Sequence, residues 1–90
     1  MIMIGVYFPA SAMTDEQYKA IDDEVTAGSP PAGLKLHTCF REGDKLAMFD
    51  VWESQETFEA FGARLMPIVE RTGVELSPPQ VVEMVAFEVP

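Results

Sequence analysis

The chain has 90 residues, with 15 acidic and 6 basic side chains and a formal net charge of −9. This charge repels phosphate backbones and anionic lipid surfaces, so the composition argues against nucleic acid and membranes as partners. No apolar run approaches the ~20 residues of a membrane span, the start has no basic residue before its short apolar stretch, and one cysteine cannot form an internal disulfide. We therefore expect one cytoplasmic domain, residues 1–90.

The first half of the chain predicts a strand, a helix and a rigid loop. Residues 1–8 are apolar at both alternating positions, which is typical of a strand buried on both faces in the middle of a sheet. Thr14 and Gln17 have the spacing of a helical capping box, and Gly28 ends the apolar periodicity of this helix. The prolines and glycines of residues 28–33 exclude regular structure there.

The second half predicts two strands, a long helix and a last strand. Residues 34–41 and 45–53 are typical of strands joined by a hairpin turn. A serine then caps a helix over residues 54–73, and Pro67 is expected to kink it because proline lacks the N–H that a helix uses. Residues 80–89 form the last predicted strand.

The order strand, helix, strand, strand, helix, strand indicates the ferredoxin-like α+β fold, with two helices on one face of a four-stranded antiparallel sheet. The strands carry apolar side chains on both faces, and 48% of all residues are hydrophobic. The helices can cover only one face. A second copy of the chain on the open face would bury the other, so we expect a homodimer.

A two-residue turn at Gly43 and Asp44 would determine which residues of the hairpin lie opposite one another. The pairs predicted on one face are Cys39 with Met48, His37 with Asp50, and Lys35 with Trp52. The pairs predicted on the other face are Phe40 with Ala47, Thr38 with Phe49, and Leu36 with Val51. A four-residue turn gives the same pairs, whereas a three-residue turn would bring His37 beside Phe49. We prefer the first register because it gathers the polar side chains on one face.

His37 is the only histidine and the main candidate for a functional residue. An opposed Asp50 would raise its pKa and fix its tautomer, which leaves the second ring nitrogen for a ligand. Trp52 would add a flat apolar wall and one N–H donor. The alternative is a histidine–aspartate pair with a structural role alone. The further candidates for the lining of a ligand site are Tyr7, Phe58 and Phe61.

Other chemistry fits the sequence less well. One histidine and one cysteine fall short of the three or four ligands of a zinc site, so we expect no metal. Neighbours on one face of a strand lie ~7 Å apart, which is long for direct proton transfer between Cys39 and His37. Cys39 is therefore expected to be a small core residue. Residues 27–33 lack the pattern and the lysine of a phosphate-binding loop.

The segment FDVWESQETFEAF, residues 49–61, resembles the dimeric α/β barrel superfamily, in which Trp-Glu-Ser closes a strand and opens a helix. This superfamily includes antibiotic-biosynthesis monooxygenase-like and stress-responsive barrel proteins, and small bacterial members are similar over nearly the whole chain. The resemblance implies a dimer that pairs two sheets face to face, with helices outside. It also implies a ligand cavity between sheet and helices, with Trp52, Asp50 and His37 on the helix side and Phe49 and Val51 facing the partner.

Two departures limit what the resemblance implies about chemistry. Haem-degrading members carry a helix histidine after this motif, and none follows Trp52 here, so no haem or other cofactor is expected. Cofactor-independent oxygenases use an asparagine, and this chain contains none. Two functions therefore remain. One is a non-catalytic dimeric domain that binds a small apolar or aromatic ligand or a protein partner. The other is a cofactor-independent monooxygenase or isomerase for an aromatic or polyketide-like substrate, with His37 as base and Asp50 orienting it.

Overall fold

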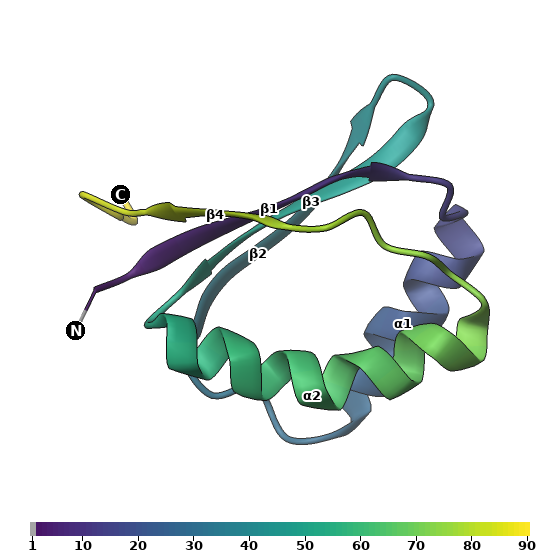
Figure 1. Ribbon diagram of the computed structural model, residues 1–90, viewed down its shortest axis with the longest axis horizontal. Helices are drawn as coiled ribbons and strands as arrows, with labels where there is room; N and C mark the ends of the chain where they lie inside the picture. The colour runs from purple at the N-terminus through teal and green to yellow at the C-terminus, as the bar shows by residue number, and fades with distance from the viewer. Residues whose placement is uncertain (1) are drawn as a thin grey trace.

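The computed structural model describes residues 2–90 and has the predicted order of strands and helices (Figure 1). The elements are β1 (Ile4–Ser11), α1 (Asp15–Ala27), β2 (Leu34–Glu42), β3 (Lys45–Trp52), α2 (Gln55–Thr72) and β4 (Gln80–Glu83). The strands form one antiparallel sheet in the order β2-β3-β1-β4, and both helices lie on the same side of it. The ferredoxin-like α+β fold is therefore confirmed.

Both helices begin at the predicted capping residues. The Thr14 hydroxyl accepts a hydrogen bond from the Gln17 N–H, and the Gln17 side chain accepts one from the Thr14 N–H. Ser54 caps α2 in the same way, and Gly73 ends that helix in the left-handed conformation. The helix α2 continues on both sides of Pro67. Neither described helix has the length and apolarity that crossing a membrane requires.

The structure corrects the limits of two strands. β1 extends to Ser11 although Pro9 lacks an N–H, because the pairing with β3 shifts between Phe8 and Ser11 and the proline lies in that irregular stretch. Its predicted first residue, Met1, lies outside the described residues. The last strand ends at Glu83 instead of residue 89, because Glu83 pairs with Ile4 and later residues run past the start of β1.

The hairpin has the predicted register except at one end. His37 lies opposite Asp50, as the two-residue turn predicts. The predicted pair of Lys35 with Trp52 is wrong, because a shift between Leu34 and Leu36 places Leu34 opposite Trp52. The extra residue at this shift is a local bulge that the spacing from the turn does not reveal.

The helix side of the sheet carries the aromatic core. Trp52 is fully buried, and its ring centroid lies 6.0 Å from that of Phe58 and 5.0 Å from that of Phe61 in α2. Val6 and Phe8 of β1 belong to the same cluster. Truncation of a buried ring of this size typically costs about 3–5 kcal/mol, so this cluster contributes strongly to the attachment of α2.

The opposite face of the sheet has no helix over it. Gly5 lies on this face, and a side chain there would meet the Phe49 ring at 2.8 Å, so the glycine lets this ring lie across β1. Leu36, Phe40 and Val82 remain 36%, 41% and 49% exposed. The open face is therefore a broad apolar surface.

Candidate functional site

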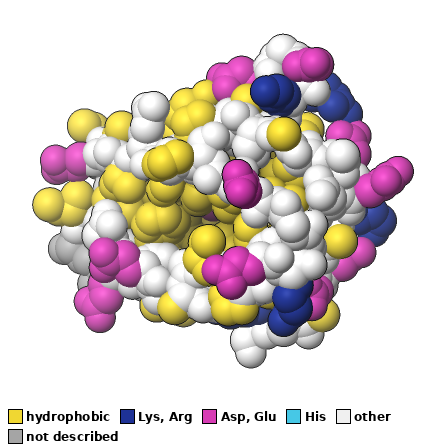
Figure 2. All heavy atoms as spheres, turned by 45° about the vertical axis from the view of Figure 1, so that its right-hand side comes forward, with side chains coloured by type: hydrophobic (Ala, Val, Ile, Leu, Met, Phe, Trp, Pro, Cys, Tyr) yellow, Lys and Arg dark blue, Asp and Glu magenta, His cyan; other side chains and the backbone are white. Residues whose placement is uncertain are grey.

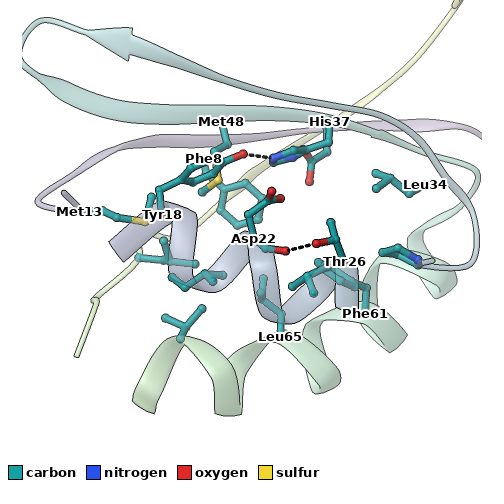
Figure 3. A pocket seen from close by; sticks show the side chains of 16 residues that line it. Phe8, Met13, Tyr18, Asp22, Thr26, Leu34, His37, Met48, Phe61 and Leu65 are labelled. Atoms are coloured by element: carbon teal, nitrogen blue, oxygen red, sulfur yellow. Dashed lines mark hydrogen bonds and ion pairs between the residues drawn. The ribbon is translucent and has the colours of Figure 1, made fainter. Parts of the chain in front are cut away.

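A cavity of about 190 Å³ lies between the sheet and the two helices (Figure 3). Most of its wall is apolar and comes from β1, both helices, the β2–β3 hairpin and the segment after α2. The residues with polar groups in its wall are Tyr18, Asp22, Thr26, His37 and Asp50. A nearly apolar hollow with a few polar side chains is the usual form of a small-molecule site.

The β2–β3 hairpin places His37 and Asp50 together in this wall. His37 Nδ1 lies 2.6 Å from Asp50 Oδ1, and the two groups are hydrogen bonded. The Asp50 side chain is 8% exposed and that of His37 is 32% exposed, so the carboxylate is buried beneath the ring. The predicted orientation of both residues toward the helices is confirmed.

The second nitrogen of the imidazole is also engaged. The Tyr18 hydroxyl lies 2.6 Å from His37 Nε2, and Figure 3 shows this bond from α1 to the sheet. When the imidazole is neutral and its Nδ1–H donates a hydrogen bond to Asp50, its Nε2 accepts a hydrogen bond from the Tyr18 hydroxyl. When it is charged, the Tyr18 oxygen accepts instead. Tyr18, His37 and Asp50 therefore form a continuous chain of hydrogen bonds.

The surroundings keep the proton on Tyr18 and favour one on His37. The pKa of Tyr18 is raised to about 12, mainly by burial, and the negative charges of Asp22 and Asp50 contribute to this rise. The hydrogen bond from Asp50 raises the pKa of His37 above its usual 6.5, against the lowering effect of burial. The charges of Asp50 and Asp22 also favour the protonated imidazole.

The structure divides the predicted ligand-binding residues among three places. Phe61 lines the cavity. Trp52 packs against Phe58 and Phe61, and neither Trp52 nor Phe58 belongs to the wall of this cavity. The predicted place of Tyr7 beside His37 is wrong, because Tyr7 pairs with Phe49 on the open face of the sheet.

Tyr7 makes a separate interaction on the open side of the sheet. Its hydroxyl donates to the Glu42 carboxylate at 2.6 Å, and the same carboxylate accepts the Ala10 N–H at 3.3 Å. This contact ties the end of β2 to β1. Sequence reasoning could not exclude Tyr7 from the site, because the face it occupies depends on the register between β1 and β3.

Tyr18 is the member of the hydrogen-bonded chain that sequence reasoning missed. Its spacing marks it only as part of the apolar stripe of α1. One feature of the sequence could have revealed it. Tyr18 carries a hydroxyl within the otherwise apolar stripe of α1, and this stripe faces the sheet. Its contact with His37 depends on where α1 crosses the sheet, which periodicity does not specify.

Cys39 does not have the surroundings of a nucleophile. Burial raises the pKa of its thiol, and the charge of Asp15 raises it further, which favours the unreactive protonated form. Among residues 2–90, no three His, Cys, Asp or Glu side chains are grouped so that they could hold a metal ion.

No protein-family model matches the chain, and no curated protein matches it by sequence. Solved structures do match it. A candidate antibiotic biosynthesis monooxygenase from Chloroflexus aurantiacus aligns with a TM-score of 0.69 at 16% identity, covering 97% of each chain. SnoaB, a cofactor-independent oxygenase from Streptomyces nogalater, aligns at 0.58 and 17% identity, covering 98% of this chain and 94% of its own.

This chain shares the fold of these two proteins. A protein of unknown function from Nitrosomonas europaea also shares it, with a TM-score of 0.53 and 20% identity over 99% of this chain and 93% of its own. The fold that the Trp-Glu-Ser segment suggests is thereby confirmed. At these identities the likeness concerns the fold, and the activity has to be argued from the cavity.

The His37–Asp50 bond can be tested by NMR titration of the single imidazole. We expect a pKa above 6.5 in the folded protein and a lower pKa in Asp50→Asn, because the amide removes the negative charge. Since the folded pKa exceeds the unfolded one, stabilisation by the pair is complete below about pH 6.5 and is lost as pH rises through the folded pKa.

Asp44→Asn is the matched control, because it makes the same change at the exposed hairpin turn. It should leave the His37 pKa nearly unchanged. An Asp50→Asn protein with an unaltered His37 pKa would contradict the assigned bond.

Proposed function

We propose that the protein binds a small, neutral, largely apolar or aromatic molecule in the cavity between the sheet and the helices. The observation that carries this proposal is the Tyr18–His37–Asp50 chain of hydrogen bonds in the wall of an otherwise apolar hollow. An apolar cavity of ~150 Å³ can hold benzene, so about 190 Å³ is sufficient for a ligand with one ring.

The charges around the cavity favour a neutral ligand. Asp22 and Asp50 both contribute to the wall, and His37 is the only basic side chain there. A ligand carboxylate would have to leave water and approach two carboxylates, of which only Asp50 is bonded to the imidazole. A single hydroxyl or carbonyl group can instead bond to Tyr18 or His37 while the ring contacts the apolar wall.

Catalysis by His37 is a second candidate function, and the hydrogen bond from Asp50 is the observation that favours it. Asp50 holds the imidazole in one orientation and stabilises its protonated form, as required of a general base. Removal of a proton from an acidic C–H or phenol is the step that a cofactor-independent monooxygenase and an isomerase share. SnoaB, of similar fold, is such an oxygenase.

We also propose that the protein is a homodimer that pairs the open sheet faces. Leu36, Phe40 and Val82 lie exposed on this face, and the Phe49 ring lies next to Gly5 on the same face. A contiguous apolar surface of this kind is typical of a protein interface. A second copy would cover it with the same residues, as a twofold interface does.

Binding can be tested with phenol and benzoate, which share a ring and differ in charge. We expect phenol to raise the melting temperature and shift the His37 ring signals in NMR spectra, and benzoate to do neither. Val25→Phe should fill the cavity from α1 and weaken phenol binding at least tenfold. Ala20→Phe adds the same ring at an exposed position of α1 and should have little effect. Equal effects of the two variants would contradict the proposed site.

The catalytic candidate can be tested by deuterium exchange at the α-carbons of phenylacetone, a neutral aromatic ketone with one ring. If His37 is a base, His37→Gln should slow the exchange by about 10²–10⁴-fold, the usual contribution of a positioned base. Lys35→Gln, an exposed change in the same strand, is the control. An unchanged rate in His37→Gln would exclude catalysis by His37 and leave the binding proposal intact.

The dimer can be tested by sedimentation at micromolar concentration, where we expect twice the chain mass of 10.0 kDa. Val82→Lys should dissociate it by placing a charge on the open face. Val81→Lys is the matched control, because Val81 is similarly exposed in the same strand but pairs with Val6 on the helix side. A monomeric unmodified protein would refute the proposal.

A further inference from the structure

A second apolar hollow lies beside the first, between α2 and the segment that leads to β4. Its volume is about 220 Å³, and Figure 2 shows a hollow rimmed by apolar side chains on the side where this segment comes forward. The residues that line it are Phe8, Phe58, Gly62, Leu65, Met66, Leu76, Ser77, Pro78 and Pro79. Ser77 is the one hydroxyl in this wall, and it bonds to the Ala10 carbonyl at 3.5 Å. The hollow therefore presents no free polar side chain.

The two hollows are adjacent and share part of their walls. Phe8, Leu65 and Leu76 line both of them. Leu65 and Leu76 are only partly buried, so a change of leucine rotamer can open a passage between the two hollows without breaking a backbone hydrogen bond. Neither volume reaches the ~300 Å³ at which small-molecule sites usually begin, whereas the two joined do.

Gly62 of α2 lies in the wall of the second hollow. Glycine inside a helix lowers stability by about 0.8–1.0 kcal/mol relative to alanine, so a glycine at such a position is expected to have a packing or functional role. At Gly5 and Gly33 an added Cβ would meet a neighbouring side chain within 3 Å, but at Gly62 it would meet nothing within 4 Å. Packing therefore does not require Gly62. Its missing side chain leaves open space in α2 at the wall of the hollow.

We propose that this hollow binds the apolar tail of the same ligand whose polar end lies at His37. This inference rests on the proposed binding function and names its ligand class, a neutral hydroxylated ring or carbonyl compound with an alkyl or prenyl chain. Gly62 determines specificity for that chain, because a larger side chain would occupy its place. The adjacent Pro78 and Pro79 restrict the backbone, so this wall of the tail site is preformed.

The proposal can be tested by measuring the affinities of phenol and a series of 4-alkylphenols. Competition with phenol and shifts of the His37 ring signals would show that the phenol ring of each ligand occupies the first cavity. In the unmodified protein each added methylene should strengthen binding by up to about fourfold until the tail site is full. Gly62→Leu should abolish this gain and leave phenol affinity within about twofold. Gly62→Ala should keep most of the gain and raise the melting temperature.

Met66→Phe provides a second way to fill the hollow, because Met66 lies one helical turn from Gly62 and lines the same wall. It should reduce the gain in affinity from each added methylene, as Gly62→Leu does. If phenol binds but chain length has no effect on affinity, the tail site is refuted and the proposed binding of phenol in the first cavity still stands. If alkylphenols bind without shifting the His37 signals while phenol does shift them, the tail site is refuted in the same way. If neither phenol nor any alkylphenol binds, the proposed function fails and the tail site with it.

Discussion

The arrangement on the helix side of the sheet depends on how the buried Asp50 carboxylate is satisfied. A buried carboxylate without a partner is strongly destabilising, and the imidazole of His37 is the partner that the structure provides at 2.6 Å. This bond fixes the orientation of the ring, so Nε2 points toward α1 and meets Tyr18. The hydrogen-bonded chain thus joins the hairpin to α1, and the apolar space beside it is bounded by both helices.

The parts of the site that lie within one hairpin could be predicted from turn length and strand alternation in the sequence. A two-residue turn determines the register outward from Gly43, and this register brings His37 opposite Asp50. The same reasoning failed at Lys35, because an irregularity at the far end of the hairpin shifts the pairing without any marker in the sequence. Helix starts were equally local, since each capping box is contained within four residues.

The parts that required the structure all depend on how distant elements meet. Tyr7 and Tyr18 are both aromatic residues with a hydroxyl, yet only Tyr18 reaches the cavity. The difference follows from the β1–β3 register, which puts Tyr7 beside Phe49, and from the crossing of α1 over β2. Gly62 is harder still to interpret from sequence, because its significance is an empty volume created by side chains from α2 and from the segment after it.

The Tyr18–His37 bond has a consequence for how selective the cavity is. Sites that reject analogues lacking a hydroxyl do so because the analogue leaves a buried polar group without a partner. Here Tyr18 already satisfies Nε2, so a molecule without a hydroxyl leaves that nitrogen bonded. A hydroxylated molecule that displaces Tyr18 exchanges one hydrogen bond for another, with little net gain. The cavity therefore discriminates between ligands by their shape and length. It tolerates a range of related molecules that differ in their polar groups.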